Sequence, residues 1–263
     1  MQCLVDSREV YVHRAGEPGR GADVLLLHGA GQDHRAWLPL LPGLARAGHA
    51  VYAPDLPGHS ASAGPPYSGV PELAGWLLEL LDALGLARCA LVGHSMGSLV
   101  ALHAATLAPS RVSHVALVAT AVPMTVSPVL LERARTDVQA AMRDIALWSH
   151  KGSREQPPDP ALVDASLRLM QSVQARWPAG DLLATDLGAC NDYRDGLQMA
   201  ARLRVPLQLV LGRADRMTPV RATEALREAA PQAQVSVLDG GHALMQEQPQ
   251  ELLRALLELL ARD

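Results

Sequence analysis

One serine lies in a segment whose spacing suits nucleophilic catalysis. Ser95 is the middle residue of Gly93-His94-Ser95-Met96-Gly97, which follows an apolar strand-like run and opens a helix-like run. A serine hydroxyl is a weak nucleophile at neutral pH, and it becomes reactive when a sharp strand-to-helix turn exposes it beside a base and near backbone N–H donors. The flanking glycines let the two backbone arms of such a turn approach each other. The segment therefore predicts a nucleophile at Ser95.

A serine nucleophile needs a base and a carboxylate that orients the base. In open α/β sheets such groups collect at the carboxyl ends of the strands. His242 follows the last strand-like run through a flexible Asp-Gly-Gly turn, and Asp215 lies just past the run at 207–211. The rival position, after the run at 114–118, offers no acid before Glu132. We therefore predict His242 as the base and Asp215 as the acid, in the chain order Ser95, Asp215, His242.

Small residues after another strand-like run, at 24–27, suit an oxyanion hole. In His28-Gly29-Ala30-Gly31 the small side chains let a backbone N–H approach a substrate oxygen closely. We predict the N–H groups of Ala30 and Met96 as the donors. His28 and Asp55 are interpreted as structural residues of their turns, and no special placement is apparent for His59.

The composition bounds the class of protein. The chain has 263 residues, of which 49% are hydrophobic, and a net charge of -4 with a pI near 6.2. It is long enough for one large domain, or one domain with an insertion. This slightly negative net charge does not indicate binding to nucleic acid or to an anionic membrane. Three widely spaced cysteines argue against a disulfide framework or a zinc site and favour a reducing compartment.

Two segments bear on localisation. The N-terminus meets charge too early for a secretory signal. The uncharged stretch 89–110 contains glycines, serines and histidines, and so favours a central strand and a buried helix over a membrane span. We expect a cytoplasmic protein with a small-molecule substrate, no nucleic-acid or membrane partner, and no metal or other cofactor. The sequence does not determine the oligomeric state.

Strand-like and helix-like patterns alternate along most of the chain. The predicted strands are 10–13, 24–28, 50–53, 90–93, 114–118, 207–211 and 235–238, and the predicted helices are 37–45, 71–84, 98–108, 219–230 and 248–261. Most of the strands are almost continuously apolar, as strands buried on both faces should be. This alternation predicts an α/β fold with a mostly parallel central sheet flanked by helices.

The alternation breaks between about 124 and 190, where three helical patterns (129–150, 161–177 and 181–187) follow one another without a strand. We predict a core of residues 1–123 and 191–263 and a helical cap of residues 124–190. The cap should determine the substrate, with Met124, Trp148, Met170 and Leu187 as candidates to line a pocket. For each of these side chains, packing between cap helices is an equally good explanation.

Together these motifs resemble the α/β-hydrolase fold family, and within it the capped, esterase-like serine hydrolases. His28-Gly29 with Trp37 and the segments 55–60, 93–97, 212–215 and 241–242 match that family in order and spacing. The resemblance implies the α/β-hydrolase fold, with the cap inserted after the sixth core strand. Epoxide hydrolases and haloalkane dehalogenases carry an aspartate at the position of Ser95, so the resemblance disfavours both activities.

The predicted function is that of a carboxylesterase-like serine hydrolase. It would cleave a small or medium, largely apolar carboxylic ester or lactone through an acyl-enzyme. Two alternatives stay open. One is hydrolysis of a carbon–carbon bond in a β-diketone-like ring-cleavage product, for which Arg133, Arg168 or Arg194 could hold the substrate's charged groups. The other is a ligand-sensing receptor, which would stall after about one turnover.

Overall fold

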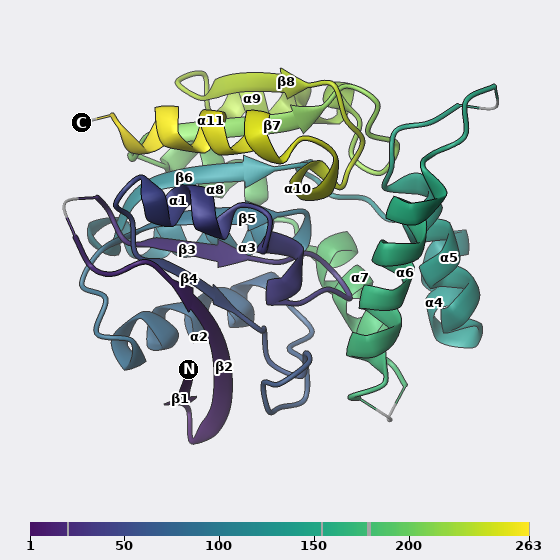
Figure 1. The fold of residues 1–263 in the computed structure, drawn as a ribbon, viewed down its shortest axis with the longest axis horizontal. Coiled ribbons are helices and arrows are strands. Elements are labelled where there is room, and N and C mark those ends of the chain that lie inside the picture. Colours follow the sequence, from purple (N-terminus) through teal and green to yellow (C-terminus); the bar gives the residue numbers. More distant parts are fainter. Residues whose placement is uncertain (20, 154, 178–179, 263) are drawn as a thin grey trace.

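A twisted sheet forms the centre of the molecule (Figure 1). The computed structural model describes residues 1–19, 21–153, 155–177 and 180–262; the predicted core and cap ranges also include residues 20, 154, 178–179 and 263, which lie outside this part. Within the described residues the sheet has eight strands in the order β1-β2-β4-β3-β5-β6-β7-β8. They are β1 (Gln2–Val5), β2 (Arg8–Ala15), β3 (Val24–Leu27), β4 (Val51–Pro54), β5 (Cys89–His94), β6 (Val112–Val118), β7 (Leu207–Gly212) and β8 (Gln234–Leu238).

The strands from β4 to β8 in this order run parallel, and only the β1–β2 and β2–β4 pairs are antiparallel. This confirms the predicted mostly parallel α/β sheet. The sequence analysis missed β1, whose exposed and half-buried residues give no continuous apolar run. Because β1 pairs only with β2, it lies at the edge of the sheet.

Helices cover both faces of the sheet, which explains why β3 is buried along its whole length. Successive side chains of a strand point to opposite faces. Leu25 and Leu27 accordingly belong to one hydrophobic cluster and Val24 and Leu26 to the other. The first cluster includes α2 (Val70–Ala83), α3 (Met96–Leu107), α8 (Gly196–Arg202) and α9 (Glu224–Ala229); the second includes η1 (His34–Trp37), α1 (Leu41–Arg46), α10 (Leu244–Glu247) and α11 (Pro249–Leu260).

Four of the helices between β6 and β7 form a group beyond the carboxyl ends of the parallel strands (Figure 1). They are α4 (Pro128–Thr136), α5 (Val138–Trp148), α6 (Pro160–Gln174) and α7 (Leu182–Asp192). These helices, with their connecting segments, are called the cap below. They share a hydrophobic cluster of their own, which includes Leu130, Met142, Met170 and Leu183.

The single helix predicted at 129–150 is wrong, because the chain forms two helices there. Asp137 lies between α4 and α5 with non-helical backbone angles, and its carboxylate accepts the N–H of Ala140 at 3.0 Å. The aspartate side chain accepts a backbone N–H that has no acceptor within the first turn of α5. Asp137 therefore caps the start of a new helix. Of the helices in the described part, none is both long and apolar enough to cross a membrane.

Candidate active site

Ser95 forms the turn between β5 and α3, with φ of 50° and ψ of -118°. This left-handed φ is costly for a residue with a side chain. On either side only glycine fits: a Cβ at Gly93 would meet the carbonyl oxygen of Gly97, and a Cβ at Gly97 would meet the backbone of Leu27. The turn therefore holds a half-buried serine at the carboxyl end of a central strand.

Asp215 and His242 come together at the ends of β7 and β8. His242 Nδ1 lies 2.9 Å from Asp215 Oδ2, and both side chains are almost fully buried. The Thr218 hydroxyl donates to the same carboxylate oxygen at 2.8 Å, and the N–H groups of Met217 and Thr218 donate to the other, each at 2.8 Å. If Nδ1–H donates to the carboxylate, Nε2 of the neutral imidazole is left as an acceptor.

Burial alone would raise the pKa of Asp215. The charge and hydrogen bond of His242 and the hydrogen bonds of Thr218 outweigh it and lower that pKa to about 2. The carboxylate is therefore ionised at neutral pH, as a group that orients and stabilises an imidazolium must be.

The loop after β3 leaves one N–H free. Gln32 N–H donates to the Gly29 carbonyl at 3.2 Å, and Gly29 N–H donates back to Gln32 Oε1 at 3.1 Å. Gly31 N–H donates to Asp186 Oδ2 at 2.7 Å. Between these two engaged donors, the Ala30 N–H donates to no group of the described residues. Residues 29–32 are called the oxyanion loop below.

Met96, the other predicted donor, is the first residue of α3. The first N–H groups of a helix have no acceptor within the helix, and the helix dipole places partial positive charge there. Met96 is fully buried as a whole residue.

A cavity of about 220 Å³ lies beside several of these groups, and Met96 and Asp215 are not among the described residues that line it. Ser95, His242 and Ala30 line it from the core. Among the described residues, no hydrogen bond joins the Ser95 hydroxyl to His242; this loose arrangement is common in enzymes without substrate. From the cap and the segments beside it come mostly apolar side chains, including Met124, Leu130, Ile145, Trp148 and Leu187.

Three of the four predicted pocket residues line this cavity, namely Met124, Trp148 and Leu187. Met170 does not line it, which corrects that prediction. It is buried in the cap cluster, where it packs against Gly31 on the oxyanion loop.

The arginines considered for carbon–carbon cleavage also lie elsewhere. Arg133 pairs with Asp144, Arg168 lies near Asp164 on the surface of α6, and none of the three lines the cavity. The arginine that does line it is the exposed Arg216, which the sequence analysis did not single out.

The cap holds the loop that carries His242. The Ser149 carbonyl, just after α5, accepts the N–H of His242 at 2.7 Å and that of the next residue at 2.9 Å. Because the acceptor is a backbone carbonyl, its position depends on where α5 ends. The placement of His242 is thus coupled to the placement of the cap.

Glu247 on α10 adds a second link at this junction. Its carboxylate accepts the N–H of Gly241 at 2.5 Å and that of Lys151 at 2.7 Å. The Lys151 ammonium group pairs with Asp239 at 2.9 Å on the surface. Lys151 is the only lysine in the sequence.

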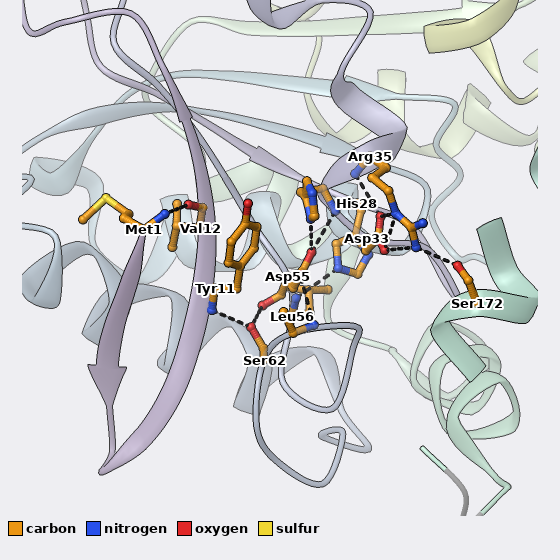
Figure 2. Close-up of polar contacts among 12 residues, drawn as sticks. Met1, Tyr11, Val12, His28, Asp33, Arg35, Asp55, Leu56, Ser62 and Ser172 are labelled. Carbon is orange, nitrogen blue, oxygen red and sulfur yellow. Dashed lines mark hydrogen bonds and ion pairs between the residues drawn. The ribbon is translucent and has the colours of Figure 1, made fainter. Parts of the chain in front are cut away.

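His28 and Asp55 hold backbone groups, as expected (Figure 2). His28 Nε2 accepts the N–H of Leu56 at 3.0 Å, so this nitrogen carries no proton. Asp55 is fully buried and accepts the N–H of His34 at 3.0 Å and that of Ala61 at 3.2 Å. Burial and the neighbouring His59 lower the pKa of His28 to about 4.

Within the described residues, one group of side chains has metal-ligand spacing: Asp33, His34 and Asp55. Its oxygens are already engaged. The Asp33 carboxylate accepts hydrogen bonds from the Arg35 guanidinium at 2.6 to 3.0 Å (Figure 2). Asp55 Oδ1 lies 2.7 Å from His34 Nδ1. These residues do not line the cavity. The arrangement is therefore that of structural turns.

Sequence analysis missed several residues around the site. Thr218 had a usable signal, because a threonine three residues after an aspartate can hydrogen-bond its carboxylate. His94 had none: Nε2 lies 3.0 Å from the His242 carbonyl and Nδ1 3.2 Å from Gln32 Oε1, contacts between distant segments. The same holds for Asp186, which is 155 residues from Gly31.

A mostly parallel sheet with a serine turn after a central strand is the architecture of the α/β hydrolases. The profile of the family described as "alpha/beta hydrolase fold" matches residues 24–249. The chain belongs to the α/β-hydrolase fold family.

Relatives of known name cover nearly the whole chain. A putative carbamate hydrolase, RutD, of Pseudomonas savastanoi pv. phaseolicola is 30% identical over 252 residues, which cover 90% of this chain and 93% of the relative. A pimeloyl-[acyl-carrier protein] methyl ester esterase of Aromatoleum aromaticum is 32% identical over 248 residues, or 87% and 94% of the two chains. The solved enol-lactonase of Burkholderia xenovorans LB400 has a TM-score of 0.86 over 100% of both chains, at 24% identity.

Proposed function

We propose that the protein is a serine hydrolase of small or medium, largely apolar carboxylic esters or lactones. The observation that carries this proposal is that His242, which is paired with the buried Asp215, lines the same cavity as the strained Ser95 turn. Two relatives, at 30% and 32% identity, are named for hydrolysis of a carbamate and of a methyl ester. Both reactions take place at an acyl carbon bonded to a heteroatom.

In the proposed mechanism Ser95 Oγ attacks the acyl carbon and His242 Nε2 takes its proton. The N–H groups of Ala30 and Met96 stabilise the oxyanion of the tetrahedral intermediate. The intermediate collapses when His242 returns the proton to the leaving alkoxide, which leaves an acyl group on Ser95. A water molecule then attacks that acyl group as it gives a proton to His242, and His242 returns the proton to Ser95 Oγ as the acid leaves. Asp215 holds the imidazole in the required tautomer throughout.

The cavity supports the proposed size and polarity of the substrate. Its volume of about 220 Å³ is below the roughly 300–1,000 Å³ of typical drug-sized sites. Apolar side chains from the cap face the nucleophile, so a short acyl chain would be desolvated on binding. Arg216 at the same cavity would favour a substrate with an oxygen-rich group at its far end.

Nitrophenyl esters of increasing acyl length, from acetate to octanoate, test the proposal. We expect kcat/KM to be highest for short chains, and Ser95→Ala to lower it at least ~10³-fold. Ser113→Ala is the matched control, because the buried Ser113 hydroxyl on β6 has no hydrogen-bond partner among the described residues. A wild-type protein that is folded but inactive on every ester and on a lactone series would contradict the proposal. A single turnover followed by a stall would favour the receptor alternative.

A further inference from the structure

A buried carboxylate of the cap reaches the oxyanion loop. Asp186 lies on α7 and is 1% exposed. Its Oδ2 accepts the N–H of Gly31 at 2.7 Å and lies 2.9 Å from His59 Nε2. Burying a carboxylate is costly unless it is paired and hydrogen-bonded. Here both partners come from the core and both engage the same oxygen.

The partners of His59 favour its charged form. Its Nδ1 lies 3.0 Å from the Pro57 carbonyl and its Nε2 2.9 Å from Asp186 Oδ2, so both ring nitrogens face acceptors. A neutral imidazole has one N–H and satisfies only one of them, whereas an imidazolium donates to both. Burial alone would lower the pKa of His59, but the charge and hydrogen bond of Asp186 outweigh it and raise that pKa above its usual value.

The surroundings of this pair contain one more acid and one more imidazole. Asp55 adds a further favourable charge to His59. The ring of His28 lies 4.9 Å away but is neutral, because its Nε2 accepts a backbone N–H. From the cap side, burial and the Asp186 charge raise the pKa of the Cys190 thiol, which therefore stays uncharged. His59 and Asp186 thus form a buried ion pair between core and cap, with Asp55 as a further negative charge that acts on His59.

The oxyanion loop is constrained from the cap side around this contact. Gly31 has φ of +65°, and a Cβ built on it would lie 3.1 Å from Leu183 Cδ1 of α7. A few residues further on, the Arg35 guanidinium reaches the Ser172 hydroxyl of α6 at 2.7 Å (Figure 2). The direction of the Ala30 N–H depends on the peptide groups before and after Ala30. Asp186 fixes the peptide group after Ala30, because it accepts the N–H of Gly31.

We propose that Asp186 is a positioning residue for the oxyanion hole, held by His59 and acting through the Gly31 N–H to aim the N–H of Ala30. This inference rests on the proposed function. The cap would then do more than shape the pocket, because docking of α7 would complete the group that stabilises the transition state.

The test compares Asp186→Asn and Asp186→Ala with wild type on nitrophenyl acetate. Asparagine keeps an oxygen for Gly31, whereas alanine removes it. We expect kcat to fall by roughly 10-fold for asparagine and 100-fold for alanine, because losing one oxyanion donor outright costs about 10²–10³. KM should change less than about 3-fold, since the oxyanion forms only in the transition state. Asp192→Asn, on the exposed end of the same helix, should match wild type.

Phenylboronic acid provides a second measurement by calorimetry. The Ser95 oxygen adds to boron, its proton passes to His242, and a tetrahedral boronate anion forms with an oxygen directed at the oxyanion hole. Its Kd should rise by the same factor as kcat falls. If Asp186→Ala does not fold, kcat and the boronate Kd are both measured on Asp186→Asn.

A kcat and boronate Kd within twofold of wild type in Asp186→Asn and Asp186→Ala would overturn the inference, as would a loss that Asp192→Asn reproduces. An inactive wild type that still binds the boronate through Ser95 would contradict the proposed function but leave this test in place, because the boronate Kd alone then reports on the loop.

Discussion

The Thr218 hydroxyl touches both members of the acid–base pair. It donates to Asp215 Oδ2 at 2.8 Å and lies 3.2 Å from His242 Nδ1. Thr218→Val leaves the buried carboxylate oxygen with one donor fewer, at a cost of about 1–3 kcal/mol. We expect kcat/KM on nitrophenyl acetate to fall roughly 10-fold. Thr218→Ser keeps the hydroxyl and should retain most of the activity; equal losses in both variants would contradict this role.

Sequence reasoning assigned Ser95, Asp215 and His242 because each has a local signature: a glycine-flanked turn or a position just past an apolar strand. His28 was also interpreted well, since its place in a glycine loop suggested a structural role. His59 was not. Its distinguishing partner, Asp186, is 127 residues away and comes from the cap. Whether a histidine is charged depends on which acceptors face its nitrogens, and those come from the fold.

Gly31 on the oxyanion loop can be compared with Gly48, another glycine with a left-handed backbone. Gly31 has φ of +65° and a Cβ there would contact α7, whereas Gly48 has φ of +92° and open space around its Cβ position. Alanine at either position should cost about 1–2 kcal/mol from backbone strain. We expect only Gly31→Ala to lower kcat, by at least about 10-fold. Thermal melts and ester kinetics of the two variants check this, and equal kinetics would contradict it.

Helices and strands were predictable where the apolar pattern is long. The strands β3, β5 and β7 lie within a residue or so of their predicted ranges, since each is buried on both faces. The cap helices were harder. Their apolar faces pack mainly on one another, and the break at Asp137 depends on a cap that periodicity does not show. The short α8 (Gly196–Arg202) was missed because seven residues carry little periodicity.

The stability of the whole molecule should depend on pH through two buried groups. The folded pKa of Asp215 is lowered from 3.8 to about 2, so its stabilising effect is present above pH 3.8 and lost as the pH falls toward 2. The folded pKa of His59 is raised above 6.5, so its effect is present below pH 6.5 and lost as the pH rises through the folded value.

Melting temperatures between pH 3 and 9 measure both effects. The double variant His59→Gln/Asp186→Asn removes the buried ion pair as two neutral amides, so neither group titrates. We expect its melting temperature to decline less than that of wild type on the alkaline side, and both proteins to lose stability alike below pH 4. Parallel curves over the whole range would show that the pair does not titrate between pH 6.5 and 9.

The single lysine has a practical consequence. Lys151 follows α5, its N–H binds Glu247 beside the His242 loop, and half of its side chain is exposed. An amine-reactive dye would therefore place its one side-chain label at the junction between cap and core. The same chemistry on a solid support would anchor molecules at this junction and restrain the cap. Coupling through a surface cysteine introduced on the opposite side of the sheet would leave the cap unrestrained.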